Sequence, residues 1–242
     1  MTIQIPLDED HHVHSRFSDD AVSTLDQNVA AARQRGLRVL CLAEHVRGDS
    51  DWLPGYLAAV EALRPVPGLA VVAGVEAKIL DRTGQLDLPG DAAGADRVLI
   101  ADHQFPGALG PVHPREVRDA LTAGSVTEGE VVSGLIEATA GALERAARPQ
   151  LAHLFSILPK MGIPETAVSD TAIGHLAGRA AAAGAMLEVN EKWACPSPRT
   201  VRAFAAAGVP LVASTDSHDC RDIGVYSAVR ELAAGISPDP VR

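Results

Sequence analysis

The chain has 242 residues, of which 47% are hydrophobic and 21% are charged, and its formal net charge is −10. This length suits one α/β barrel, so we expect residues 1–242 to form a single domain. Nothing approaches the roughly 20 apolar residues of a membrane span, and an acidic chain without clustered Lys and Arg is not expected to bind nucleic acid. The first ten residues are unlike a secretory leader, which predicts a cytoplasmic location.

Short β-branched runs alternate with longer amphipathic segments along the chain. We expect strands at residues 3–14, 38–45, 69–77, 97–103, 150–156, 185–191 and 209–218. We expect helices at residues 23–35, 51–63, 127–147, 169–183, 198–207 and 224–234. We expect a hairpin at residues 78–88, where the alternation would otherwise place the third helix, and a loop at residues 104–115. The alternation predicts a parallel sheet, and seven units suit a closed or nearly closed barrel, although an open doubly wound sheet would give the same pattern.

Histidines gather where the predicted strands end. Six of the nine lie at or just after a strand's carboxyl end, and they are His12, His14, His45, His103, His153 and His218. The acids Glu76, Glu188 and Asp216 fall at the same level. Active sites of α/β barrels lie on this rim. Imidazole and carboxylate ligands without a thiolate suit zinc, manganese or iron, so the sequence predicts a metal site there.

Seven short motifs carry these side chains. They are DHHVH at 10–14, SDD at 18–20, AEH at 43–45, GVE at 74–76, ADH at 101–103, AHL at 152–154 and STDSH at 214–218. In this order they resemble the motifs of the polymerase and histidinol phosphatase (PHP) family. The resemblance implies a distorted seven-stranded, TIM-like (β/α)7 barrel that holds three divalent metal ions at the carboxyl ends of its strands and hydrolyses phosphate esters.

The resemblance also implies how the metal ligands are divided. The first site would comprise His12, His14, Glu76 and Asp216. The second would comprise Glu76, His103 and His153, so that Glu76 bridges the two ions. The third would comprise His45, His218 and an acid of the SDD motif. We prefer Asp19 to Asp20 there, because the family's usual motif places its acid directly after the serine.

We expect the substrate to be a small phosphorylated metabolite, such as histidinol phosphate, a sugar phosphate or a nucleotide. A water between the first two ions would attack phosphorus in line, and the third ion would orient a phosphoryl oxygen. Residues expected to take part in catalysis are Glu76, Asp216 and His218. Residues expected to contact the phosphate or the rest of the substrate are Arg16, Arg47, Lys160 and Lys192. Glu188 and Asn190 are expected to support imidazoles, and packing is the expected role of Trp52 and Trp193.

Three other functions remain open from the sequence. The first is an exonuclease or phosphodiesterase of the same family, which the acidic balance disfavours. The second is hydrolysis of a carbon–nitrogen bond, which related barrels perform with a bridging lysine where this chain has Glu76. The third is a noncatalytic, metal-binding regulatory barrel, which the complete ligand set disfavours. Turnover of a phosphomonoester against a phosphodiester by metal-loaded protein separates these possibilities.

Overall fold

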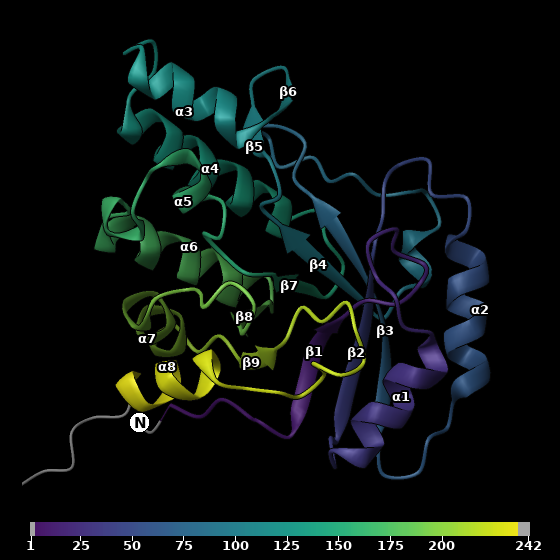
Figure 1. Ribbon diagram of the computed structural model, residues 1–242. Helices are drawn as coiled ribbons and strands as arrows, with labels where there is room; N and C mark the ends of the chain where they lie inside the picture. The colour runs from purple at the N-terminus through teal and green to yellow at the C-terminus, as the bar shows by residue number, and fades with distance from the viewer. Residues whose placement is uncertain (1–2, 237–242) are drawn as a thin grey trace, which may run out of the picture.

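The seven apolar runs form the strands of one parallel sheet (Figure 1). The computed structural model describes residues 3–236. The strands of this sheet are β1 (Glu9–Val13), β2 (Val39–His45), β3 (Ala70–Lys78), β4 (Arg97–Ala101), β7 (Pro149–Leu151), β8 (Met186–Asn190) and β9 (Leu211–Ser214). They follow one another in chain order around the sheet. This order excludes the open, doubly wound alternative, in which the strand order reverses near the middle of the sheet.

The first and last strands meet, which nearly closes the sheet into a barrel. The backbone N–H of His14 donates to the carbonyl of Ser217 at 2.8 Å, and Ser217 N–H donates back to the carbonyl of His12 at 3.3 Å. The buried carboxylate of Asp10 strengthens this seam by accepting from the N–H groups of Thr215 at 3.0 Å and Gly224 at 2.9 Å. The predicted distorted seven-stranded barrel is therefore confirmed.

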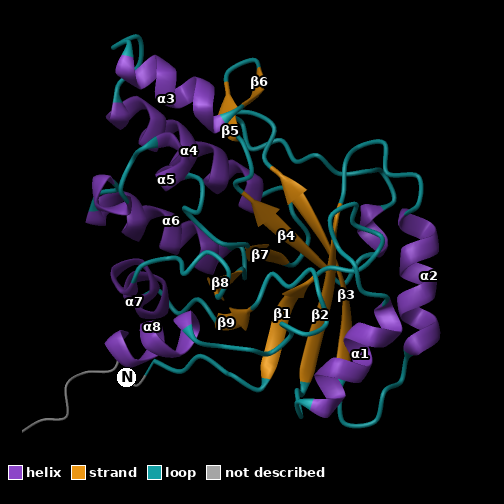
Figure 2. Cartoon of the chain, viewed as in Figure 1, coloured by secondary structure: helices purple, strands orange, loops and turns teal. Residues whose placement is uncertain are grey.

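The helices predicted between the strands cover the outside of the sheet, as Figure 2 shows in purple. They are α1 (Leu25–Gln34), α2 (Leu53–Leu63), α4 (Glu128–Leu143), α6 (Asp170–Ala182), α7 (Pro198–Ala206) and α8 (Ala228–Ile236). Each lies within a few residues of its predicted range. Capping boxes begin two of these helices, with Thr127 and Glu130 at α4 and Thr24 and Gln27 at α1.

The chain interrupts the alternation of strands and helices at two segments, and only the first has the predicted structure. The predicted hairpin after β3 is present, with an antiparallel bridge between Ile79 and Leu86. The predicted loop 104–115 instead contains the short strands β5 (Phe105–Gly107) and β6 (Gly110–Val112) and leads into α3 (Pro114–Thr122). Its many Gly and Pro residues concealed these elements, because both residue types are depleted in strands. Helix α5 (Leu158–Met161) and the 3-10 turns η1 (Ala92–Gly94) and η2 (Glu165–Ala167) complete the structure.

The barrel interior is narrow. A small apolar cluster of Cys41, Ala43, Leu99, Ala101 and Ala152 lies apart from the large core between sheet and helices. A Cβ on Gly74, in the strand beside this cluster, would lie 2.9 Å from Cys41 Sγ, so only glycine fits there. Side chains alternate along a strand, so the next residues on the same face after Ala43, Gly74 and Ala101 are His45, Glu76 and His103. The small inner residues thus support a ring of polar side chains.

Within residues 3–236, none of the helices combines the length and apolar character that a membrane crossing requires.

Candidate metal centre

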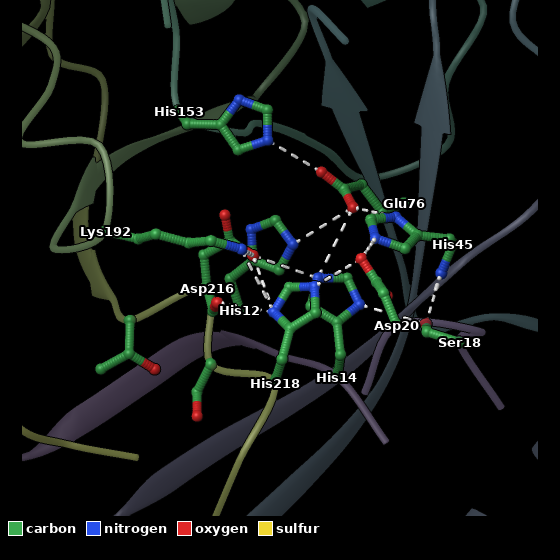
Figure 3. Close-up of polar contacts among 12 residues, drawn as sticks. His12, His14, Ser18, Asp20, His45, Glu76, His153, Lys192, Asp216 and His218 are labelled. Atoms are coloured by element: carbon green, nitrogen blue, oxygen red, sulfur yellow. Dashed lines mark hydrogen bonds and ion pairs between the residues drawn. The ribbon is translucent and has the colours of Figure 1, made fainter. Parts of the chain in front are cut away.

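The carboxylate of Glu76 lies at the centre of the polar ring (Figure 3). Its Oε1 is 2.9 Å from His153 Nε2 and 3.1 Å from His103 Nε2. Its Oε2 is 2.6 Å from His45 Nδ1, 3.5 Å from His12 Nε2 and 3.6 Å from His14 Nε2. Burial opposes the charge of this carboxylate, but the surrounding imidazoles, led by His103 and His12, hold the pKa of Glu76 well below its usual range. Five histidines from the ends of four strands therefore share one anionic centre.

Asp216 extends the centre beyond the end of β9. Its Oδ1 lies 3.3 Å from His14 Nε2, and its backbone is left-handed, with φ of 52°. His153 also has positive φ, at 30°. Non-glycine residues rarely adopt this conformation, and such strain is concentrated at functional sites. Burial opposes the charge of Asp216 as well, but His12, His14 and His153 lower its pKa below the usual range.

Three buried histidines direct one ring nitrogen toward this centre and have the other nitrogen engaged by a neighbouring side chain. His12 Nδ1 lies 3.0 Å from Glu188 Oε2, and His153 Nδ1 lies 3.2 Å from Asp102 Oδ1. His14 Nδ1 lies 3.2 Å from Ser18 Oγ, which in turn donates to a carboxylate oxygen of Glu44 at 2.7 Å. A partner of this kind fixes which nitrogen carries the proton and which can bind a metal.

Glu188 is held in place by two amides. The side chains of Gln150 and Asn190 donate to its two oxygens at 2.9 and 2.5 Å. The geometry agrees with the predicted supporting role of Glu188 and Asn190. The sequence reasoning did not identify Asp102, Glu44 or Ser18 as supports, although each lies in a metal motif or next to a motif histidine.

The carboxylates also alter the proton affinity of the imidazoles. Burial disfavours a charged His153, but Asp102 and Glu76 outweigh it and raise the pKa of His153 to about 10. Burial likewise opposes charge on His12, whose pKa Glu188 and Glu76 nevertheless raise well above its usual value. In His14 burial prevails and lowers the pKa to about 3.

The donor set fits a divalent cation. Among the described residues, the buried atoms His12 Nε2, His14 Nε2 and Glu76 Oε2 have no partner in hydrogen-bonding geometry, although His45 Nδ1 lies close to Glu76 Oε2. Leaving a buried polar atom unpaired costs free energy, and a cation that bound all three would remove that cost. Three groups have ligand atoms within 4.8 Å of one another, and they are His12–His14–Asp216, His45–Glu76–His103 and His14–His45–His218. Nitrogen and oxygen donors of this kind suit zinc, manganese or iron.

The SDD motif supplies Asp20 rather than Asp19. Asp20 Oδ2 lies 3.1 Å from His218 Nε2 and 3.5 Å from His45 Nε2. Asp19 is 76% exposed, and its Oδ2 lies 3.7 Å from Arg47. The geometry therefore favours Asp20 over Asp19, because the turn after Ser18 directs the second acid of the motif, not the first, toward the histidines.

A cavity of about 390 Å³ lies over the outer side of the cluster. Of the four residues predicted to contact substrate, Arg47 and Lys192 line it. Arg16 donates to the carbonyl of Val22 at 2.7 Å, and Lys160 lies over the ring of Trp193, so the structure does not place either on the cavity wall. The wall also includes Lys78, Gln104 and Trp193, which the sequence reasoning did not assign to substrate contact.

Comparisons with known proteins agree with this geometry. The model of the PHP domain family matches residues 10–190. A probable phosphatase of Vibrio vulnificus (strain YJ016) is 26% identical over 248 residues, which cover 96% of this chain and 86% of the relative. A probable phosphatase of Caldicellulosiruptor saccharolyticus is 35% identical over 110 residues, which cover 43% of this chain and 46% of the relative.

A solved structure has the same fold. It is the crystal structure of histidinol phosphate phosphatase from Lactococcus lactis subsp. lactis Il1403, complexed with zinc, L-histidinol and phosphate. It matches with a TM-score of 0.66 and 18% sequence identity, and the match covers 94% of this chain and 92% of the other. At this identity the likeness supports the barrel assignment and leaves the substrate to be argued from the site itself.

Proposed function

We propose, from the premise that the chain belongs to the PHP domain family, that its polar cluster hydrolyses a phosphate monoester of a small metabolite. The enzyme class predicted from the sequence, a metal-dependent phosphoesterase, is confirmed by the family and by relatives described as probable phosphatases. The monoester substrate and a set of three divalent ions are our proposals.

The observation that carries the proposal is that three buried atoms without a hydrogen bond, His12 Nε2, His14 Nε2 and Glu76 Oε2, lie close together beside a polar cavity. A purely structural cluster would be expected to pair such atoms with one another or with neighbouring donors. Their geometry supports a first cation site that Asp216 completes.

The chain's residues divide among three proposed sites. The first is formed by His12, His14, Glu76 and Asp216, and the second by Glu76, His103 and His153. The third is formed by Asp20, His45 and His218, with Asp20 in place of Asp19. When bound, divalent cations would polarise the phosphoryl oxygens and lower the pKa of an attacking water. Because Glu76 contributes to two of these sites, it would hold both cations beside the cavity.

The wall of the cavity beside Asp216 and His218 is where we place the leaving oxygen. Lys192 Nζ lies 3.5 Å from Asp216 Oδ1 and 3.3 Å from His218 Nδ1. An ammonium group fixed there neutralises the negative charge that grows on this oxygen as its bond to phosphorus breaks. Arg47 lines the same cavity and offers a guanidinium group to a phosphoryl oxygen.

The size and polarity of the cavity favour a small substrate. About 390 Å³ holds a phosphoryl group with a compact organic portion, and the charged lining favours a polar one. The solved neighbour was captured with L-histidinol and phosphate, which are ligands of this size. Histidinol phosphate, a sugar phosphate and a nucleotide are the substrates that we propose to test.

The test is phosphate release by protein loaded with Mn²⁺ or Zn²⁺, measured on these monoesters and on one phosphodiester. We expect turnover of at least one monoester and its loss in folded His12→Ala and Glu76→Gln variants. Cleavage of the diester alone would indicate a phosphodiesterase. Bound metal without turnover of any ester would indicate a noncatalytic barrel and would contradict the proposal.

A further inference from the structure

The two oxygens of the Asp216 carboxylate face different partners. Oδ1 lies 3.3 Å from His14 Nε2, within the first proposed cation site. Oδ2 accepts a hydrogen bond from the indole Nε1–H of Trp193 at 2.9 Å. A carboxylate with both oxygens free could rotate or bind a cation through both oxygens. The hydrogen bond from the indole therefore restricts the orientation of the Asp216 carboxylate.

Trp193 is itself fixed by the turn that follows β8. Its backbone N–H donates to Asn190 Oδ1 at 2.8 Å. The backbone N–H of Asn190 donates to the carbonyl of Cys195 at 2.8 Å, which closes the turn around the tryptophan. The side chain of Asn190 also donates to Glu188, which contacts His12, so Asn190 is hydrogen-bonded both to Trp193 and to the support of His12.

The ring of Trp193 also contacts two other side chains. Lys160 Nζ lies 3.9 Å from the ring centroid, a cation–π distance. The imidazole of His153 lies edge-on to the ring at a centroid separation of 6.4 Å. Trp193 is 40% exposed and lines the cavity. Trp193 therefore lines the cavity and contacts both Asp216, a proposed ligand of the first site, and His153, a proposed ligand of the second.

We propose that Trp193 is a positioning residue that fixes Asp216, so that only Oδ1 faces the first cation. Lys160 acts through the indole, by holding its ring, rather than by direct contact with phosphate. This inference rests on the proposed metal-dependent function, because it concerns a ligand of that metal site. It differs from the role expected of either residue from the sequence.

The test uses the fact that the chain has two tryptophans, Trp52 and Trp193. Trp52 packs against Phe17 and Tyr56, which makes it a matched control for the same substitution. In Trp52→Phe protein, emission comes from Trp193 alone. We expect this emission to change as Zn²⁺ is added and to saturate together with Zn²⁺ binding, because the cation alters the acceptor of the indole N–H.

The second measurement is the Zn²⁺ affinity of Trp193→Phe protein, which keeps an aromatic wall but lacks the N–H donor. We expect it to bind Zn²⁺ about tenfold more weakly, the scale found when an outer partner of a ligand is removed. We expect kcat for the monoester to fall with little change in KM, since the cavity wall is preserved. Trp52→Phe should leave the Zn²⁺ affinity unchanged.

Either unchanged Trp193 emission at saturating Zn²⁺ or native Zn²⁺ affinity in folded Trp193→Phe protein would overturn the inference and leave the proposed function intact. Protein that binds no Zn²⁺ and releases no phosphate from any ester would overturn both. The emission measurement requires no change at position 193, so it remains decisive even if Trp193→Phe fails to fold.

Discussion

The inner and outer halves of the histidine cluster are built differently. His12, His14 and His153 are buried, and each has its second ring nitrogen beside a carboxylate or hydroxyl group supplied by another residue. In contrast, the side chains of His45, His103 and His218 are 25%, 33% and 18% exposed and line the cavity. The inner half is thus fixed before any ion binds, whereas the outer half faces substrate. We expect substitutions to be costlier in the inner half.

Glu76 joins the two halves, so its loss should have the largest effect. Glu76→Gln keeps the size of the side chain but removes the charge that five imidazoles share. Phosphate release should fall on the order of 10³-fold, beyond the 10–100-fold cost typical of an outer partner. Steady-state kinetics and metal analysis would measure this. Activity within tenfold of the native protein, with metal retained, would contradict the central place of Glu76.

The inner half should also make metal binding strongly dependent on pH. The pKa values of His12 and His153 are raised, so these imidazoles hold protons at neutral pH without metal, and a metal binds only the deprotonated nitrogen. Affinity should therefore fall as pH falls, by about tenfold per pH unit for each displaced proton. Calorimetry in buffers of different ionisation enthalpy should detect proton release at pH 7. Equal affinity at pH 6 and pH 8 would disprove this.

Substitution of Glu188 tests the inner half without replacing a proposed ligand. Glu188→Gln weakens the hold on His12 Nδ1, and we expect a 10–100-fold loss of metal affinity. Glu191→Gln is the matched control, because Glu191 accepts from the backbone N–H groups that begin α8. That variant should lower the free energy of unfolding by about 1 kcal/mol and leave metal affinity unchanged. Equal metal affinities in the two variants would contradict the supporting role proposed for Glu188.

The outer half should show the smallest effect, in the SDD motif. Asp20→Asn removes a carboxylate from His45 and His218, and we expect activity to fall about tenfold, at the low end for a metal-site partner. Asp19→Asn should retain native activity, because Asp19 faces solvent beside Arg47. A larger loss in Asp19→Asn than in Asp20→Asn would restore the original preference for Asp19.

The sequence could predict the positions of residues on regular strands but not those of residues in irregular turns. The predicted strands placed His12, His14, His45 and Glu76 together at the carboxyl ends, because parallel strands of a barrel share that rim. The sequence could not separate Asp19 from Asp20, which lie in an irregular turn where no fixed period applies. It also missed the contact of Trp193 with Asp216, which depends on how the turns after β8 and β9 fold against each other.

The central claim is that the inner and outer histidines hold divalent cations around Glu76. Anomalous diffraction at the zinc absorption edge, from crystals of protein loaded with Zn²⁺, tests it most directly. We predict peaks between Glu76 and its neighbours, one toward His12, His14 and Asp216 and another toward His103 and His153. Crystals of the loaded protein without an anomalous peak within bonding distance of Glu76 would contradict the account.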